Sequence, residues 1–498
     1  MLYDKRAAGV LLHISSLPSP YGIGTLGKEA FHFVDFLKES NQTYWQILPI
    51  SPPSLGNSPY SAFSSYAGNP LFIDLDLLEK DGLLKKKDYA HLNWGQQEDK
   101  VNYKAVLAGR DIVLRIAVEN FLKKKNQTAY KKFIKQNEHW LNDYSLFMAI
   151  HNIHNKEWTS WPKGLKHRDK KDIDAFKKEH HKEITYQNVV QYFFFTQWNA
   201  LKKYANKNGI EIIGDVPIYV ALDSCDVWSN PKLFQLDKEG NPSFVAGCPP
   251  DAFSKDGQNW MNPLYNWAYH KKTGYHWWID RIDHLCHIYD ILRIDHFRGF
   301  DSYYAIPNPG KAKDGHWRKG PGIELFNALK KKAQYNLIAE DLGFLTDSVI
   351  KLLADTGYPG MKIIQFGFDS RDPSSDTYQP HRYPTNCIVY TGTHDNDTLL
   401  GYLKSADKAD VNLAKEYFGI SKDESFNFEV MKGLYASVAN TTIVQAQDIL
   451  SLGKTARMNI PATETGNWVW RAKKGAFTKT LAKKLARYMV IYNRIPNK

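Results

Sequence analysis

Short apolar runs recur along the chain, and stretches with helical spacing separate most of them. Val, Ile, Leu and aromatic residues dominate each run, as they do in buried strands. The runs lie at 8–14, 43–50, 210–216, 291–300, 336–343, 361–369, 386–397 and 441–450. Apolar residues at helical spacing fall at 28–39, 277–289 and 346–355. About eight strands alternating with helices predict a (β/α)₈ barrel.

Acidic residues gather at or near the carboxyl ends of several runs. They are Asp215, Asp295, Glu340, Asp369 and Asp395. A doubly wound sheet also alternates strands and helices. In a barrel, however, the carboxyl ends of all strands meet on one face, where active sites lie. Acidic residues at so many strand ends therefore favour the barrel over the open sheet.

Two long stretches interrupt the regular alternation. Residues 51–208 begin as a loop rich in Ser, Pro, Gly and Tyr and continue as a charged, mostly helical region. Residues 217–290 contain a Pro- and Gly-rich loop carrying Trp260, followed by helices. We expect one catalytic barrel over residues 1–498, with these two stretches as insertions and the first of them mainly helical.

Composition narrows the class of protein. The 498 residues are 43% hydrophobic, enough for a large core. The four cysteines are not paired as C-x-x-C, so neither a disulfide framework nor a zinc site is indicated; they are Cys225, Cys248, Cys286 and Cys387. The first residues lack a signal-peptide pattern, and no apolar run approaches the roughly 20 residues of a membrane span. We expect a cytoplasmic protein without a membrane anchor.

The formal charge of +12 permits a nucleic-acid hypothesis. However, the lysine clusters at 85–87, 123–125 and 330–332 are scattered and lie in helix-like polar contexts. The G-x-G of Gly22 and Gly24 lacks the rest of a dinucleotide fingerprint. A solvated, lysine-rich surface is the better interpretation, and we expect no nucleic-acid partner.

The run at 291–300 carries two charges, Arg293 and Asp295. Residues two apart on a strand share a face, so both point the same way. A carboxylate beside a guanidinium stays ionised, which suits a nucleophile. A buried structural ion pair is the alternative. Glu340 follows three apolar residues and sits among like charges, and both effects would raise its pKa, as a general acid needs.

Such a pair of carboxyl groups matches retaining glycoside chemistry, which needs an ionised nucleophile and a protonated acid about 5–5.5 Å apart. Asp395 would then stabilise the oxocarbenium-like state or bind sugar hydroxyls. His394 and His296 suit hydrogen bonds to hydroxyls, although each could equally be a packed histidine. A divalent metal is a competing interpretation of the cluster. The charge of Arg293 at that place disfavours it, so we expect no metal.

Several motifs then occur together and in order. They are SPYSAFSSYAGNP, IIGDVPIYV, PPDAFSKDGQNWMNPLY, RIDHFRG, AEDLG, YTGTHDND, QDIL, RMNIP and GNWVWR. Nearly end to end, the chain resembles the 4-alpha-glucanotransferases, or amylomaltases, of glycoside hydrolase family seventy-seven in the alpha-amylase clan. The resemblance implies acids on barrel strands four, five and seven: Asp295 as nucleophile, Glu340 as acid/base and Asp395 as transition-state stabiliser.

The resemblance also implies the residues that bind substrate. Arg293, His394 and Asp215 would support the cleaved sugar. Tyr60 and Ser58 match a loop that contacts donor glucose, Trp260 and Gln258 match a lid over the acceptor side, and Asp369 and Asn459 match further sugar contacts. Cys248 and Ala462 depart from the family pattern. No cofactor is implied.

The implied activity is transfer of α-1,4-glucan segments from a donor maltooligosaccharide to the 4-hydroxyl of an acceptor, with retention, through a covalent glucosyl-enzyme. Only about fifty residues follow the last strand, so we expect no C-terminal β-sandwich. A retaining α-1,4-glucan hydrolase on the same barrel is the nearest alternative. An inactive glycan-binding or nucleic-acid-binding protein would not need the full acid set. We expect glucans as partners and a monomer or weak homo-oligomer.

Overall fold

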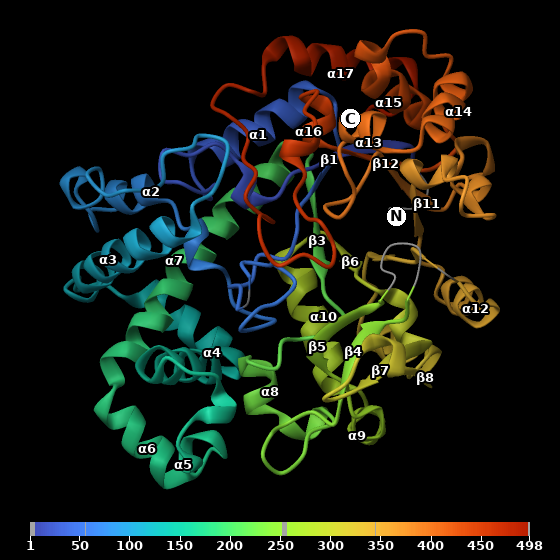
Figure 1. Cartoon of the computed structure of the whole chain (residues 1–498). Helices are drawn as coiled ribbons and strands as arrows, with labels where there is room; N and C mark the ends of the chain where they lie inside the picture. The colour runs from blue at the N-terminus through green and yellow to red at the C-terminus, as the bar shows by residue number, and fades with distance from the viewer. Residues whose placement is uncertain (1–4, 55, 251–255, 344, 497–498) are drawn as a thin grey trace.

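In the computed structural model, which describes residues 5–54, 56–250, 256–343 and 345–496, parallel strands form a barrel (Figure 1). Its eight strands run in the order β10-β11-β12-β1-β2-β3-β6-β9 within the described residues. The strands are β1 (Ala7–Leu11), β2 (Tyr44–Gln46), β3 (Glu211–Val216), β6 (Ile291–Ile294), β9 (Leu337–Ala339), β10 (Gly360–Ile363), β11 (Cys387–Tyr390) and β12 (Thr441–Gln445). Every strand pair in this sheet is parallel. The predicted barrel is confirmed.

The seam between β9 and β10 is joined by two hydrogen bonds rather than by a strand ladder. The Ala339 N–H donates to the Pro359 carbonyl at 3.0 Å. The Met361 N–H donates to the buried Asp341 carboxylate at 2.6 Å. A Cβ on Gly360 would lie 2.5 Å from that carboxylate, so only glycine fits where the two strands meet.

Each of the eight predicted strands is present, but most are shorter than the apolar run that predicted them. The run at 361–369 is the clearest case, because its strand ends at Ile363 and a short 3₁₀ helix, Ile364–Phe368, follows. The run stays apolar there because that helix is also buried, with Ile364 and Phe368 in the core. Hydrophobicity reports burial and does not by itself mark where a strand ends.

Helices cover the outside of the barrel. The predicted helix at 28–39 is α1 (Lys28–Glu39), which buries one face, including Phe33 and Phe36. Those predicted at 277–289 and 346–355 are α10 (His276–Ile288) and α12 (Asp347–Thr356). The others around the barrel are α11 (Ile323–Lys332), α13 (Leu399–Ser405), α14 (Lys408–Phe418), α15 (Phe426–Ala436), α16 (Ala446–Ile449) and α17 (Lys479–Ile491).

The region between β2 and β3 is mainly helical and projects to one side of the barrel (Figure 1). Its long helix α7 pairs with α4 and leads back into barrel strand β3. Aromatic rings fill the space between the helices. The ring centroids of Phe121 and Tyr192, for example, lie 5.5 Å apart. The helices are α2 (Leu75–Lys80), α3 (Tyr103–Leu122), α4 (Thr128–His154), α5 (Lys163–Lys166), α6 (Lys170–Glu179) and α7 (His181–Lys207).

A second, antiparallel sheet stands beside the barrel, and the sequence pattern did not predict it. Its order is β5-β4-β7-β8. The strands are β4 (Phe244–Cys248), β5 (Gln258–Pro263), β7 (Ser302–Pro307) and β8 (His316–Lys319), and the short helices α8 (Cys225–Ser229) and α9 (Trp267–Lys272) lie in the same part of the chain. The sheet therefore combines residues from before and after β6. Strands β5 and β8 are largely polar and partly exposed, so they lack the apolar run that marks a buried strand.

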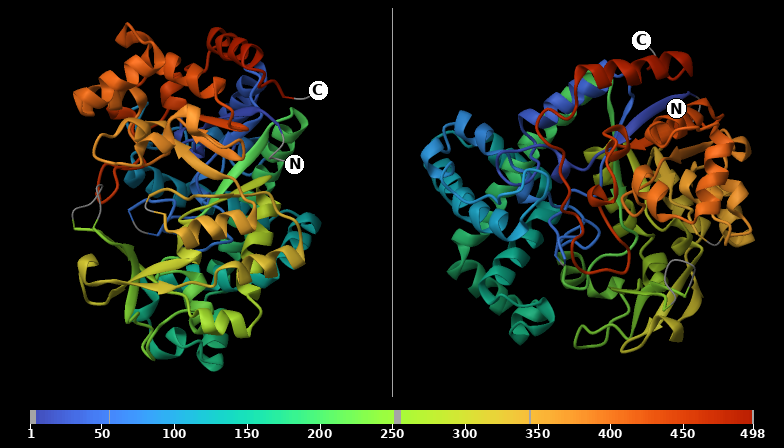
Figure 2. Two further views of the ribbon diagram at one scale, coloured as in Figure 1. Left: turned by 90° about the vertical axis from the view of Figure 1, so that its right-hand side faces the viewer. Right: turned by 45° about the horizontal axis from the view of Figure 1, so that its top comes forward.

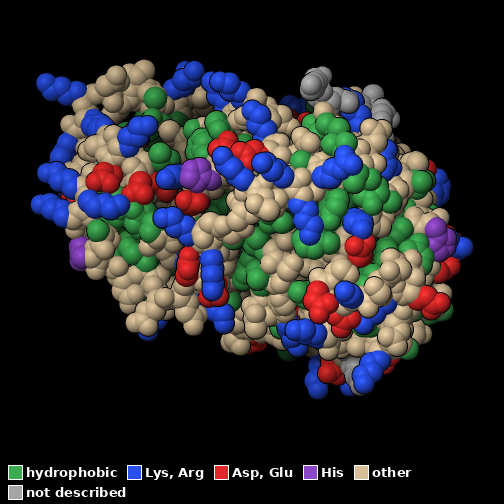
Figure 3. Space-filling model, turned by 90° about the horizontal axis from the view of Figure 1, so that it is seen from above, with side chains coloured by type: hydrophobic (Ala, Val, Ile, Leu, Met, Phe, Trp, Pro, Cys, Tyr) green, Lys and Arg blue, Asp and Glu red, His purple; other side chains and the backbone are tan. Residues whose placement is uncertain are grey.

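The first and last segments of the described chain lie close together (Figure 2). The Arg6 guanidinium donates to the carbonyls of Tyr492, Ser437 and Tyr435. In the described residues after Gln445 the structure has helices and turns but no further strand. The described part of the chain contains no helix with both the length and the apolar character needed to cross a bilayer. Lysine and arginine side chains on the face shown in Figure 3 are dispersed, with acidic side chains among them.

Candidate active site

Charged side chains from four barrel strands meet at the carboxyl end of the barrel. Asp215 belongs to β3, and Arg293 lies beside it in register on β6. Asp295 directly follows β6, Glu340 directly follows β9, and Asp395 lies in the loop after β11. Because the strands are parallel, their carboxyl ends share one face, and the structure brings the three predicted catalytic acids to that face.

Arg293 lies at the base of this cluster. Its Nη1 donates to both oxygens of Asp215, at 2.9 and 2.7 Å, and to Asp295 Oδ1 at 2.9 Å. Its Nε contacts the Met361 sulfur at 3.3 Å. Arg293 and Asp215 are buried, whereas the Asp295 side chain is 27% exposed. Burial raises the pKa of Asp215 to about 6, and Arg293 opposes that rise. The guanidinium therefore lies behind Asp295, whose carboxylate faces solvent.

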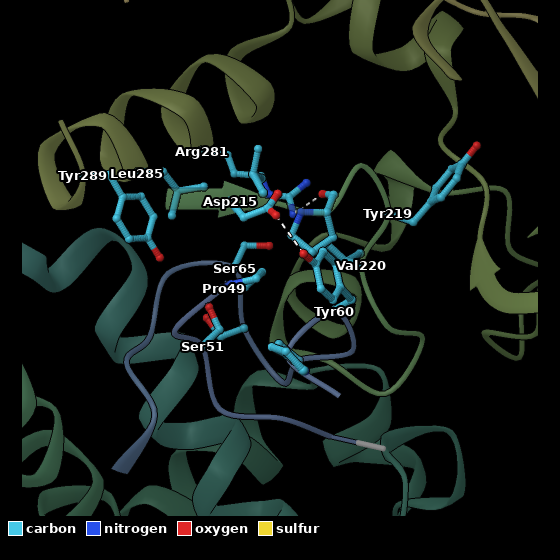
Figure 4. A pocket seen from close by; sticks show the side chains of 15 residues that line it. Pro49, Ser51, Tyr60, Ser65, Asp215, Tyr219, Val220, Arg281, Leu285 and Tyr289 are labelled. Atoms are coloured by element: carbon cyan, nitrogen blue, oxygen red, sulfur yellow. Dashed lines mark hydrogen bonds between the residues drawn. The ribbon is translucent and has the colours of Figure 1, made fainter. Parts of the chain in front are cut away.

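Tyr60 connects this ion pair to the loop after β11. Its hydroxyl donates to Asp215 Oδ2 at 2.7 Å (Figure 4) and lies 3.3 Å from His394 Nδ1. The Tyr60 and His394 rings stack at 4.7 Å between centroids. Trp468 adds a third ring, 5.6 Å from His394. The long loop after β2 is thus anchored in the site by an aromatic stack and a charge-assisted hydrogen bond.

Asp395 is held from two sides. His394 Nε2 lies 3.3 Å from Asp395 Oδ2, and the Asn459 amide donates to Asp395 Oδ1 at 2.6 Å. Burial alone would raise the pKa of Asp395, but His394 and Asn459 lower it to about 2. The same contact raises the pKa of His394 against the effect of its burial. The Asp395 side chain is 45% exposed, so this carboxylate is both anionic and accessible.

Glu340 has a different environment, built from backbone amides. The His296 N–H donates to Glu340 Oε2 at 2.7 Å, and the Leu342 N–H donates to Oε1 at 2.8 Å. His296 reaches this position with a left-handed backbone, φ +50°, which is uncommon outside glycine. Burial raises the pKa of Glu340 to about 7; Arg293 opposes the shift and Asp295 adds to it. Glu340 can therefore hold a proton near neutral pH, as a general acid requires, while the neighbouring Asp295 is ion-paired with Arg293.

The cavity shown in Figure 4 lies behind these groups. It has a volume of about 20 Å³ beside Asp215 and Tyr60, with Ser51, Ser65 and Tyr289 in its wall. That volume is near the limit for a single water molecule and far too small for a sugar ring. Substrate must therefore approach from the side on which Asp295 and Asp395 are exposed.

The predicted residues of the second insertion also reach the site. The Trp260 ring meets the His296 ring edge-on, 5.0 Å between centroids, and its Nε1 donates to Gln258 Oε1 at 3.1 Å. His296 Nε2 is buried and has no hydrogen-bond partner in the described structure. Residues 251–255 of the same motif lie outside the described residues.

Ser58 lies in the turn that precedes Tyr60 and accepts a hydrogen bond from the Tyr60 N–H at 3.3 Å.

Asp369 has a different set of contacts from the other predicted residues. It follows the short 3₁₀ helix after β10, and both its oxygens are bound by the Arg371 guanidinium, at 2.8 and 2.6 Å. That contact lowers the pKa of Asp369. No contact in the described structure links it to Arg293 or to the three acids. The Asp369 carboxylate is thus already engaged by a neighbour two residues along the chain.

The sequence interpretation missed three residues that contact the cluster. Met361 lies against Arg293, Trp468 packs on His394, and Arg457 donates to the backbone carbonyl of Asp395. Met361 and Trp468 look like core residues in the sequence, and both are in fact buried. Arg457 stands in the motif RMNIP, two residues before Asn459, and that proximity is the one signal that could have identified it. In the described residues, no group of acidic, histidine and cysteine side chains has the arrangement of a metal site.

Comparison with known proteins adds independent evidence. A family model described as 4-alpha-glucanotransferase matches residues 12–478. The chain is 49% identical over 488 residues to a 4-alpha-glucanotransferase of Clostridium butyricum, covering 97% of this chain and 100% of that one. It is 45% identical over 496 residues to the 4-alpha-glucanotransferase of Streptococcus pneumoniae serotype 4, covering 99% and 98%.

A solved structure agrees with these relatives. The amylomaltase from Streptococcus agalactiae in complex with acarbose superimposes with a TM-score of 0.96 at 44% identity, covering 98% of this chain and 100% of that one. The match covers nearly the whole chain, so it is not confined to the barrel strands and the helices around them. The chain therefore belongs to the 4-alpha-glucanotransferase family, and it is an enzyme of glucan transfer.

Proposed function

We propose that this enzyme moves α-1,4-glucan segments from a donor maltooligosaccharide to the 4-hydroxyl of an acceptor glucan or glucose, by a retaining double displacement on Asp295. The observation that carries the proposal is the contrast between Asp295 and Glu340. Asp295 is paired with Arg293, whereas Glu340 has a pKa of about 7. They follow adjacent strands, which lie about 4.8 Å apart, in keeping with the short separation of carboxyl groups in retaining enzymes.

In the first step, Glu340 donates its proton to the glycosidic oxygen while an Asp295 oxygen attacks the anomeric carbon. The bond to the reducing-end piece breaks, that piece leaves with the proton, and an ester joins the remaining glucan to Asp295. Asp395 is anionic and accessible, so it stabilises the positive charge that develops at the anomeric carbon. Arg293 balances the charge of Asp295 before the attack and again once the ester is cleaved in the second step.

In the second step, the 4-hydroxyl of an acceptor sugar replaces the departed piece. Glu340, now a carboxylate, takes the hydroxyl proton as the hydroxyl oxygen attacks the anomeric carbon. The bond from that carbon to the Asp295 oxygen breaks, Asp295 leaves as a carboxylate, and a new α-1,4 bond forms with retention. Transfer to sugar must compete with hydrolysis by water. The Trp260 ring against His296 provides an apolar surface that holds the acceptor and excludes water.

The remaining predicted residues are proposed as sugar contacts. His296 Nε2 is suited to meet a hydroxyl, since it is unpartnered and burial lowers its pKa to about 4, which keeps the ring neutral. Asp369 would contact sugar only through a carboxylate that Arg371 also binds. The other proposed substrate-binding residues are Arg293, His394, Asp215, Tyr60, Ser58, Trp260, Gln258 and Asn459.

The wider setting is also part of the proposal. Residues 1–498 act as one catalytic unit, with insertions at 51–208 and 217–290, the second extended by β7 and β8. The enzyme works in the cytoplasm on maltooligosaccharides in glycogen or starch metabolism, as a monomer or weak homo-oligomer. It needs no cofactor and binds no nucleic acid. Support for the second point comes from the face in Figure 3, where Lys and Arg side chains are mixed with acidic ones.

The test is incubation of the pure enzyme with maltotriose alone, with products separated by chain length. Glucose together with a ladder of longer maltooligosaccharides is expected, because the glucosyl-enzyme passes to sugar. Glucose and maltose with nothing longer would favour the retaining hydrolase instead. Unchanged maltotriose would contradict the roles of all three acids. Acarbose, which the Streptococcus agalactiae amylomaltase binds, should inhibit the reaction.

A further inference from the structure

We propose that Arg457 is a positioning residue for Asp395, acting by fixing the backbone of both Asp395 and Asn459 so that the Asn459 amide stays on the carboxylate. The inference rests on the proposed function only in taking Asp395 as the transition-state stabiliser. Arg457 itself touches neither the Asp295 carboxylate nor that of Glu340 in any contact of the described structure. Its effect on the reaction would pass through the contacts of Asp395.

The contacts of Arg457 join two loops from different barrel strands. Its Nη2 donates to the Asp395 carbonyl in the loop after β11. Its Nε donates to the Asn459 carbonyl at 2.8 Å in the loop after β12. One planar guanidinium therefore binds the main chain of both partners of the Asn459–Asp395 hydrogen bond.

The site needs such a connection because Asp395 and Asn459 are 64 positions apart and neither lies on a strand. Asp395 is also 45% exposed, so packing alone does not hold its side chain. The Asn459 N–H also donates to the His394 carbonyl at 3.0 Å, and Trp468 packs on the His394 ring. The amide–carboxylate bond at 2.6 Å is short, and bonds of that kind weaken steeply when the geometry changes.

A long-range charge effect would be a different explanation for any role of Arg457. Lys454 lies three residues before it and is exposed on the same loop. Both cations act electrostatically on Asp397, beyond Asp395 in the chain. Lys454→Met is therefore a matched control, since it removes one positive charge from the loop without removing a hydrogen bond to Asp395 or Asn459.

The experiment measures kcat and KM for transfer from maltotriose in Arg457→Met, Arg457→Lys, Asn459→Ala and the double variant Arg457→Met with Asn459→Ala. Arg457→Met should lower kcat at least tenfold with KM changed less than threefold. Arg457→Lys, which can still donate to one carbonyl, should recover part of kcat. The double variant should be close to the slower single variant, because both substitutions disrupt the same contact.

Any of these results would overturn the inference: an Arg457→Met enzyme with kcat within twofold of wild type, multiplication of the two single effects in the double variant, or an equal loss in Lys454→Met. A kcat loss in Arg457→Met that Arg457→Lys does not relieve would also count against positioning. Circular dichroism and the thermal midpoint establish that each variant is folded. Asp395→Asn separates this from the proposed function. If Asp395→Asn keeps full activity, the role of Asp395 is wrong, whereas an inactive Asp395→Asn beside a normal Arg457→Met contradicts only the positioning role.

Discussion

Arg293 Nη1 donates to Asp215 Oδ2 at 2.7 Å, although the two residues lie 78 positions apart in the chain. Both are buried side by side on β3 and β6, and the same nitrogen also binds Asp295. The ion pair at the base of the candidate site is thus part of the barrel interior. It affects both the stability of the fold and the charge presented to substrate.

Replacing Arg293 by Met should destabilise the fold as well as abolish activity. The substitution leaves the Asp215 carboxylate buried without its cation, and removing one partner of a buried ion pair costs about 3–5 kcal/mol of unfolding free energy. Urea unfolding followed by tryptophan fluorescence measures this. Adding Asp215→Asn to Arg293→Met should recover part of the loss, since it removes the unpaired charge. An unchanged urea midpoint in Arg293→Met would contradict the prediction.

The rate should fall at alkaline pH as Glu340 loses its proton. The proposed first step needs a protonated Glu340, and the pKa of Glu340 is raised to about 7. The value of kcat/KM should therefore fall about tenfold per pH unit above that pH. Asp395, with a pKa lowered to about 2, stays ionised throughout this range. The measurement is initial transfer rate on maltotriose at a series of pH values.

Glu340→Gln provides the control for that profile. It should lower kcat on maltotriose by about 10²–10⁴-fold, the usual contribution of a general acid. Ester formation from α-maltosyl fluoride should survive, because fluoride leaves without strong acid assistance, and the alkaline limb should be missing for that donor. If the same alkaline limb persists in Glu340→Gln, another group is responsible for it.

Trp260→Ala should shift the balance from transfer toward hydrolysis. The substitution removes the ring that packs edge-on against His296, and water then reaches the glucosyl-enzyme more easily. The ratio of new reducing ends to transferred glucan should rise several-fold. Trp317→Ala is the matched control, because Trp317 is 41% exposed on β8 of the same sheet. Equal ratios in the two variants would argue against a special role for Trp260.

Asp448 should make the folded enzyme less stable as pH rises. Burial raises its pKa from 3.8 to about 7. Between about pH 4 and pH 7 the folded chain therefore keeps a proton that the unfolded chain has released, so the stabilisation it provides is lost as pH rises through that window. Asp448→Asn cannot titrate. The thermal midpoint of Asp448→Asn minus that of wild type should therefore increase from pH 5 to pH 8.

The exposed aspartate Asp347 provides a comparison for this effect. Asp347→Asn removes a carboxyl from the surface instead of from the core, so it controls for the loss of one acidic group elsewhere in the chain. Glu340 titrates in the same range but is present in all three proteins, so it cancels in the differences. A constant offset between Asp448→Asn and wild type from pH 5 to pH 8 would rule out titration of Asp448 as the cause.

Much of the barrel could be predicted from local pattern. Parallel strands covered by helices are buried on both faces, so they appear as continuous apolar runs, and all eight were visible. The antiparallel sheet was not, because β5 and β8 are partly exposed and short, and because β4 and β7 come from opposite sides of β6 in the chain. A pairing between distant, half-polar segments leaves no periodic signal in either one.

The sequence by itself determined which chemical groups stand at strand ends: Arg293 and Asp295 on one face of a strand, Glu340 after an apolar run, and the motifs that carry the family resemblance. Only the tertiary structure decided how they meet. Three hydrogen bonds join residues that lie far apart in the chain. They run from the Tyr60 hydroxyl to Asp215, from the His296 N–H to Glu340, and from Arg457 to the Asp395 carbonyl. Local sequence encodes backbone conformation and burial, whereas hydrogen bonds between distant side chains exist only once the barrel has brought the strand ends together.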